Sequence, residues 1–120
     1  MDTTERSEAD IIAQTPITVR LGQEDHEVKL LVAKDSRKWR EATAKLLSKL
    51  PEYAAIDTED PDKFSKGMSA LLVNMPDKVI DLFFLYARDL KKNDIEAVAT
   101  DAQICRGFEQ VAAVAFPFVS

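Results

Sequence analysis

The first hydrophobic pattern in the chain is an alternation of apolar and polar residues, which is typical of β-strands with one buried face. It covers residues 17–21, "ITVRL", and residues 27–32, "EVKLLV", and the polar link between them, "GQEDH", begins with Gly22. We predict a β-hairpin with a five-residue loop that contains His26. Because two strands alone are marginally stable, the apolar face of the hairpin is expected to pack on helices. The residues of that face are Ile17, Val19, Leu21, Val28, Leu30 and Val32.

The pattern then changes to apolar residues three and four positions apart, which is the period of an α-helix with one buried face. Residues 34–51, "KDSRKWREATAKLLSKLP", predict a first helix with Asp35 or Ser36 as its N-cap and Pro51 as its stop. The opposite side of this helix is charged, so we expect it to lie at the surface. Its buried stripe should consist of Trp39, Ala42, Thr43, Leu46, Leu47 and Leu50.

Two further helical segments are predicted, one on each side of Pro76. The earlier one begins near Pro61 or Asp62, and the sequence around Pro76 indicates either a kink or a break followed by a new helix. The later one contains residues 79–90, "VIDLFFLYARDL", whose apolar residues cover an arc of roughly 200°, with Leu85 outside it. An arc so wide needs more than one packing partner, which makes it a candidate for a partner-binding surface.

The last helix is predicted to begin after Thr100, because Gln103 three residues later completes a capping box. The segment before it, "IEAVAT", fits either a short strand or a loop. The resulting fold class is α+β and mainly helical, with an N-terminal β-hairpin packed on about four helical segments. Residues 1–15 lack periodicity and are expected to be a flexible arm, and residues 16–120 a single α+β domain. The buried stripe of the last helix should be Ile104, Phe108, Val111, Ala112 and Ala115.

Composition and charge narrow the range of functions. No apolar run approaches the length of a membrane span, and the polar, acidic N-terminus is unlike a secretory signal. We therefore expect a cytoplasmic protein that does not bind membranes. The formal net charge of −5 argues against general nucleic-acid binding.

The charges are nevertheless unevenly distributed along the chain. Residues 34–49 contain six basic and two acidic residues, whereas residues 52–62 contain five acids and no base. This segregation fits either a solvated helix face beside an acidic loop, or complementary surfaces on neighbouring subunits or on a partner of mixed charge. The basic residues proposed for such contacts are Arg37, Lys38, Lys45 and Lys49.

Residue types that carry catalysis are sparse. His26 is the only histidine and Cys105 the only cysteine, so we expect no histidine-based triad, no zinc site and no internal disulfide. The acids in 57–62, "DTEDPD", do not follow the EF-hand calcium pattern, and the three glycines are too scattered to form a phosphate-binding loop. The chain is therefore expected to be no enzyme and to bind no metal or cofactor.

Apolar surface remains as the candidate functional feature. In addition to the wide arc in 79–90, the C-terminus carries no charge after Glu109. The tail either folds back to cover the core or contributes, with the arc, a surface that another chain covers. The six candidates for partner contacts are Phe83, Phe84, Leu85, Phe116, Phe118 and Val119.

The opening "ITVRLGQEDHEVKLLVAKDSRKWREA" resembles the start of the tail assembly chaperones of tailed bacteriophages. The ending "IEAVATDAQICRGFEQVAAVAFPF" is similar to the acidic-then-apolar last helix of that family. The resemblance is one of pattern over most of the chain, and it transfers no role to any single residue. It implies a small, non-enzymatic cytoplasmic protein, in the short form of the family, that binds and solubilises the tape-measure protein and helps to recruit tail-tube subunits.

The residues alone leave other functions open. One is a small cytoplasmic adaptor or regulatory protein that binds a helical partner through an apolar groove. Another is a nucleic-acid-associated protein that uses the basic first helix, although Trp39 is the only aromatic residue among those basic positions. Self-association through the segregated charges is a further expectation.

Overall fold

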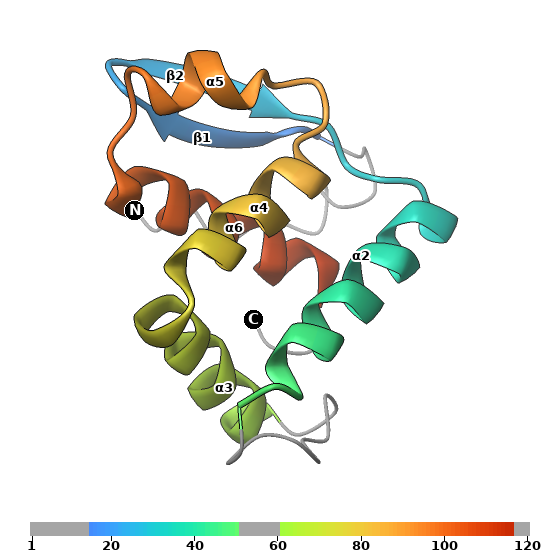
Figure 1. Ribbon diagram of the computed structural model, residues 1–120. Coiled ribbons are helices and arrows are strands. Elements are labelled where there is room, and N and C mark those ends of the chain that lie inside the picture. Colours follow the sequence, from blue (N-terminus) through green and yellow to red (C-terminus); the bar gives the residue numbers. More distant parts are fainter. Residues whose placement is uncertain (1–14, 51–60, 117–120) are drawn as a thin grey trace.

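A computed structural model describes residues 15–50 and 61–116 of the chain, and Figure 1 shows their arrangement. In this part, a two-stranded hairpin precedes five helices, so the predicted α+β, mainly helical fold is confirmed. The expected N-terminal arm lies almost wholly outside the described residues. The elements are β1 (Ile17–Leu21), β2 (Glu24–Val28), α2 (Ala33–Leu47), α3 (Pro61–Asn74), α4 (Pro76–Tyr86), α5 (Lys92–Glu96) and α6 (Asp101–Ala115).

The hairpin turn is tighter than the sequence pattern suggested. The strands pair antiparallel along their whole lengths, so Gly22 and Gln23 alone form the loop and the predicted five-residue loop was wrong. Gly22 has a φ of 67°, a conformation that glycine adopts without strain and that two-residue hairpin turns require. His26 consequently lies in β2 opposite Val19, and not in the loop.

The second strand begins and ends earlier than predicted: it covers Glu24–Val28 and not 27–32. It ends at Val28 because β1 offers no partner beyond Ile17. Val28, which pairs with Ile17, is the last residue of β2, and the residues after it connect the sheet to α2. In this connector Leu30 is half-buried and Val32 is 68% exposed, so neither belongs to the sheet's apolar face as predicted. The apolar run misled the prediction because alternation continues after the pairing has ended.

Helix α2 begins at Ala33, two residues before Asp35, the earlier of the two predicted N-caps. Its N-cap is Val32, which makes no side-chain capping bond. Asp35 lies instead in the first turn, where a carboxylate is favoured by the helix dipole, and its Oδ2 is 3.2 Å from Nη1 of Arg88. The helix ends at Leu47, and the predicted stop, Pro51, lies outside the described residues. The predicted stripe is confirmed as buried at Trp39, Thr43, Leu46, Leu47 and Leu50, with Ala42 half-buried.

The segment around Pro76 is a break and not a kink. Helix α3 ends at Asn74, and α4 starts at Pro76, whose fixed φ and missing N–H suit the first turn of a helix. Helix α4 ends at Tyr86, four residues before the end of the predicted apolar stretch 79–90. The short α5 buries Ile95. Of the segment 95–100, for which a strand or a loop was expected, the first two residues end α5 and the rest is a turn, so the loop alternative holds there and no strand forms.

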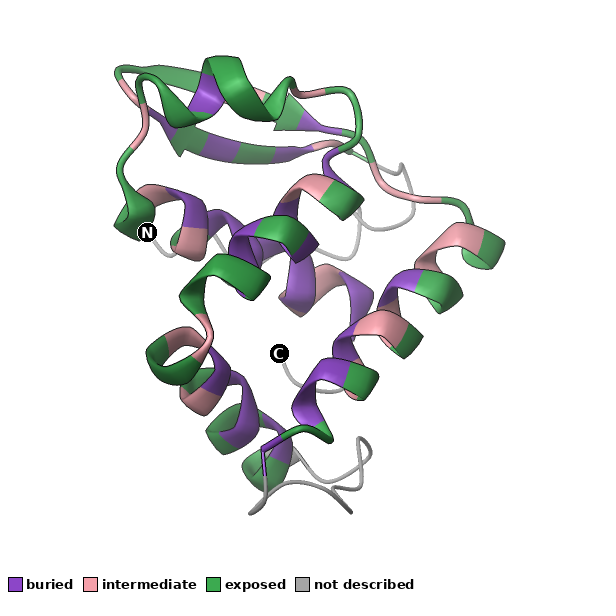
Figure 2. Ribbon diagram, in the orientation of Figure 1, coloured by how far each residue is buried: buried purple, intermediate pink, exposed green. Residues whose placement is uncertain are grey.

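Helix α6 lies at the centre of the structure, and its prediction is confirmed. Thr100 and Gln103 form both bonds of the capping box. The expected stripe is buried throughout and packs against α4 on one side and β1 on the other. Figure 2 shows buried residues along the inner sides of the helices and exposed residues on the outer face of the hairpin. The ring centroids of Trp39 and Phe108 are 5.9 Å apart, so α2 and α6 meet through aromatic packing.

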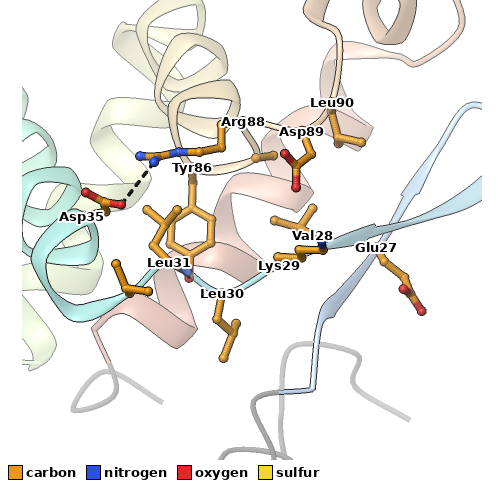
Figure 3. Close-up of a pocket in the computed structure, with 12 residues that line it drawn as sticks. Glu27, Val28, Lys29, Leu30, Leu31, Asp35, Tyr86, Arg88, Asp89 and Leu90 are labelled. Atoms are coloured by element: carbon orange, nitrogen blue, oxygen red, sulfur yellow. Dashed lines mark hydrogen bonds and ion pairs between the residues drawn. The ribbon is translucent and has the colours of Figure 1, made fainter.

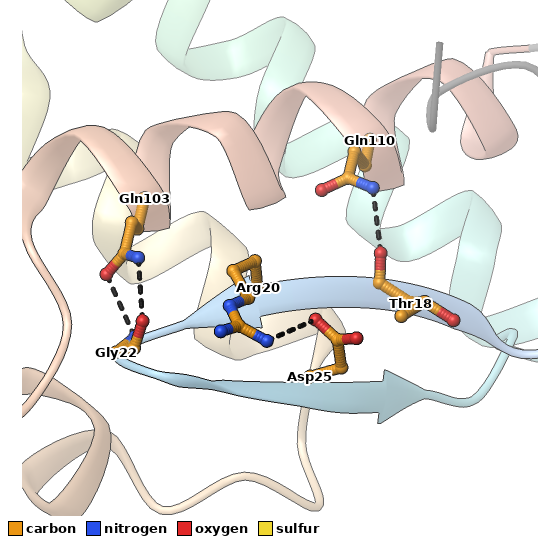
Figure 4. Close-up of polar contacts among 6 residues, drawn as sticks. All are labelled: Thr18, Arg20, Gly22, Asp25, Gln103 and Gln110. Atoms are coloured by element: carbon orange, nitrogen blue, oxygen red, sulfur yellow. Dashed lines mark hydrogen bonds and ion pairs between the residues drawn. The ribbon is translucent and has the colours of Figure 1, made fainter. Parts of the chain in front are cut away.

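Two glutamines of α6 attach the hairpin to the helix, as Figure 4 shows. The side chain of Gln103 accepts a hydrogen bond from the N–H of Gly22 at 2.9 Å and donates one to its carbonyl oxygen at 3.0 Å. Two turns later, Nε2 of the buried Gln110 donates to the carbonyl oxygen of Thr18 at 2.8 Å. All three hydrogen bonds satisfy backbone groups that lie outside the two-stranded ladder.

Gly107 allows α6 to approach α4 and β1 closely. A Cβ at this position would lie 2.7 Å from Cε1 of Phe83 and 2.9 Å from Cγ1 of Val19, which is closer than real side chains come. Phe83 and Val19 are both fully buried. The glycine therefore has a packing role that a helical pattern alone does not reveal.

Candidate functional site

The structure places two of the predicted partner contacts in the core. Phe83 is fully buried and Phe116 is 3% exposed, so the expectation that they form open surface is corrected. Phe83 fills the space left by Gly107, and the ring centroid of Phe116 is 4.5 Å from that of Phe64 on α3. Phe118 and Val119 lie outside the described residues.

Most of the wide apolar arc is thus covered by the chain itself. Phe84 is half-buried and packs edge-on against Phe83, with ring centroids 5.1 Å apart. Leu85 remains 50% exposed. Of the six predicted partner contacts, Leu85 is the described residue with the most open side chain.

Leu85 lies in a groove between α2 and α4, with a volume of about 420 Å³. We call this feature the α2–α4 groove. Its apolar residues are Ala42 and Leu46 from α2, and Leu82 and Leu85 from α4. Its charged residues are Lys45, Lys49, Lys78 and Asp81.

The groove follows from residue spacing on the two helices. On α2, positions 38, 42 and 45 are separated by four and then three residues, which places them on one face, and Lys49 follows four positions later, just after the helix ends. On α4, positions 78, 81 and 85 do the same. The chain thus presents two facing stripes that combine short or apolar side chains with lysines.

Two contacts hold the helices in this arrangement. The indole N–H of Trp39 donates to the carbonyl oxygen of Leu82 at 2.8 Å in the buried interior. Near the start of α2, Asp35 forms its ion pair with Arg88, which follows α4 (Figure 3). The α2–α4 groove is therefore supported by a buried hydrogen bond to the backbone of its lining residue Leu82 and by an ion pair outside its lining.

The groove carries an excess of positive charge. Asp81 is its single acid, and its Oδ1 is 2.8 Å from Nζ of Lys92. This hydrogen bond and the charge of Asp81 raise the pKa of Lys92. Among the residues that the structure describes, Lys45, Lys49 and Lys78 make no side-chain ion pair. Within the described residues, three ammonium groups without an ion-pair partner therefore surround the apolar floor.

The predicted charged contacts divide into two pairs. Lys45 and Lys49 line the α2–α4 groove together with Leu85, so the structure brings these separately predicted residues together. Arg37 and Lys38 are exposed on α2 but outside the lining. Sequence reasoning missed Lys78, although its spacing of seven residues from Leu85 places both on one face of the helix.

A second hollow, of about 210 Å³, lies where the connector after β2 passes the end of α4 (Figure 3). Leu30 and Leu31 of the connector face Tyr86 and Leu90 across it, and the N–H of Leu31 donates to Oη of Tyr86 at 3.4 Å. Sequence analysis missed this feature because it assigned the connector to a strand. Its apolar lining is interrupted by the ion pair of Asp35 and Arg88, so it carries less binding surface than the α2–α4 groove.

The described residues offer little catalytic or metal-binding chemistry. Within them, no three His, Cys, Asp or Glu side chains gather closely enough to hold a metal ion. Burial raises the pKa of the Cys105 thiol, and the charges of Asp101 and Glu109 add to the effect, so the nucleophilic thiolate is disfavoured. Over the same ranges, no helix has the length and apolar character needed to cross a membrane.

Comparison of the chain with protein-family models, with curated proteins and with solved structures finds no match.

Proposed function

We propose that the chain is a non-enzymatic tail assembly chaperone of a tailed bacteriophage. Its client is the tape-measure protein, which it binds and keeps soluble in the host cytoplasm, and it helps to recruit tail-tube subunits. The observation that carries the proposal is the α2–α4 groove, in which the exposed Leu85 lies among three lysines that make no ion pair within the described residues. The resemblance of the sequence to this chaperone family supplies the identity of the client.

The groove has the properties that a chaperone of helical clients needs. A long helical protein exposes an apolar stripe before assembly, and a partner must cover that stripe while remaining charged elsewhere. The α2–α4 groove offers leucines at the spacing of a helix surface, and the rest of α2 carries exposed charges that favour solubility. A binding function of this kind needs no reacting group.

The test is co-expression with a tape-measure candidate, identified as a very long, heptad-rich reading frame immediately downstream, followed by affinity purification and determination of the mass of the complex. We expect a soluble complex of defined stoichiometry, with the tape-measure protein insoluble when expressed alone. A client that is soluble alone and does not co-purify would contradict the proposal. Recovery of a defined host protein instead would favour the adaptor function, and a mass equal to a multiple of this chain alone would indicate self-association.

A matched pair of variants connects the complex to the groove. Leu85→Asp places a charge on the apolar floor and should reduce the recovered client by about 10-fold or more, the change that a central contact produces. Val73→Asp makes the same kind of change on α3, where Val73 is 80% exposed and outside the groove. It should leave recovery unchanged. Equal losses in both variants would assign binding to general surface charge.

A further inference from the structure

We infer that the α2–α4 groove binds an acidic amphipathic helix, whose apolar stripe lies on the leucines and whose carboxylates face the lysines on both walls. The inference rests on the proposed function only in taking this groove as the binding surface. It adds the chemical class of the segment that the groove recognises.

The shape of the groove favours a helix as its occupant. From Ala42 to Lys49 and from Lys78 to Leu85, each wall extends over eight residues, or roughly 12 Å at the rise of an α-helix. About two turns of a third helix laid along the two walls match this length, with apolar anchors at positions i, i+3 or i+4, and i+7. Leu46 and Leu82, which are 8% and 7% exposed, form the floor, and Leu85 is the most exposed leucine of the groove.

The charges of the walls specify an acidic partner and which of its two flanks carries more acidic residues. Lys45 on α2 and Lys49, two residues after the end of α2, are four positions apart, so they match two carboxylates one turn apart on one flank of the partner. The α4 wall offers Lys78, while Asp81 on the same wall is already paired with Lys92. The partner is therefore expected to carry more acidic residues on the flank that faces α2 than on the flank that faces α4.

Two other occupants fit the groove less well. A second copy of this chain would bring the same lysines against each other if both grooves met, which repulsion disfavours. A nucleic acid would use the lysines, but its bases stack on aromatic side chains, and the apolar lining of the groove is aliphatic. The combination of aliphatic floor and basic walls is matched best by leucines flanked by glutamates.

The experiment measures fluorescence anisotropy of a labelled synthetic helical peptide of about 18 residues titrated with the full chain. The peptide carries leucines on one stripe, glutamates on both flanks and alanines elsewhere, and a second peptide replaces every glutamate with lysine. We expect the acidic peptide to bind at least about 10-fold more tightly than the basic one, with affinity falling as salt is added. Equal binding of both peptides, or no binding of the acidic one, would overturn the inference.

Charge-reversed variants locate the site. Lys45→Glu combined with Lys49→Glu should weaken binding of the acidic peptide by about 10-fold or more and improve binding of the basic peptide. The control combines Lys66→Glu and Lys91→Glu, which change the net charge equally at exposed positions outside the groove and should alter affinity by less than about 2-fold. Circular dichroism spectra establish that each variant is folded. An equal loss in the control, or equally effective competition by single-stranded DNA, would also overturn the inference.

The two proposals fail separately. A tape-measure complex that forms normally while the acidic peptide does not bind refutes only the groove chemistry. Peptide binding that depends on Lys45 and Lys49, together with no tape-measure complex, supports the groove chemistry and refutes the proposed client.

Discussion

The two sides of α4 illustrate two kinds of helix surface. On the side of α6, Phe83 packs against Gly107 so closely that no further side-chain atom fits. On the side of α2, Leu82 and Leu85 face a groove of about 420 Å³. On the α6 side the glycine removes side-chain bulk, so the helices pack closely. On the α2 side, Lys45, Lys49 and Lys78 line the groove beside the leucines. The first surface is covered by other parts of the chain, whereas on the second surface Leu85 remains exposed among the described residues.

This comparison predicts the largest loss of stability at Phe83. Phe83→Ala removes a fully buried ring and should lower the free energy of unfolding by about 3–5 kcal/mol. Phe83→Leu keeps most of the side-chain volume and should lower the free energy of unfolding by distinctly less. Urea unfolding followed by circular dichroism measures both. If Phe83→Ala unfolds with unchanged midpoint and slope, the ring is not part of the core, and the distinction between the two sides of α4 fails.

The next largest effect is expected at Gly107. Gly107→Ala gains about 1 kcal/mol in helix propensity but introduces a Cβ within 3 Å of side chains of Phe83 and Val19. Overpacking of this kind should give a net loss of about 1–3 kcal/mol. In a double-mutant cycle, Phe83→Leu should relieve part of that loss because the shorter side chain leaves room for the methyl group. A stabilised Gly107→Ala variant would show that the helices separate easily.

The hydrogen bonds that the glutamine side chains of α6 make to the hairpin should contribute less to the free energy of unfolding. Gln110→Met keeps the length and volume of the side chain but removes the donor to the carbonyl oxygen of Thr18, with an expected loss of about 1 kcal/mol. Hydrogen exchange of the hairpin amides should accelerate by a corresponding factor. Gln23→Met, in the exposed turn, is the matched control and should change neither quantity. Equal exchange rates in the two variants would exclude a role for Gln110 in anchoring β1.

Local sequence signals predicted the parts of the fold whose causes are local. The capping box of Thr100 and Gln103, the interruption at Pro76, for which a kink or a break was predicted, and the stripe of α6 all depend on residues a few positions apart. The hairpin loop was predicted wrongly because the outcome depended on the φ of Gly22 and on where β1 ends, and an apolar alternation determines neither. The contact of Gly107 with Phe83 joins positions distant in sequence, which periodicity does not reveal.

The candidate site was predicted in pieces for the same reason. Leu85 was identified as lying outside its arc, and Lys45 and Lys49 as an unusual basic concentration, but their meeting across α2 and α4 is a tertiary fact. Phe83 was grouped with Leu85 because both lie in one apolar stretch. Their different burial depends on α6, which the sequence pattern of α4 does not contain.

The smallest effect on stability is expected at Leu85, although its effect on binding is expected to be large. The side chain is already half exposed, so Leu85→Ala should lower the free energy of unfolding by about 1 kcal/mol or less. Urea unfolding measures both Leu85→Ala and Phe83→Ala, which lie two residues apart on the same helix. The two losses compare the open and the closed side of α4 directly. A loss as large as that of Phe83→Ala would mean that Leu85 is covered within the folded chain, for example by residues outside the described ranges. The lysines of the groove would then surround a closed surface, and a partner helix would have no apolar anchor on α4.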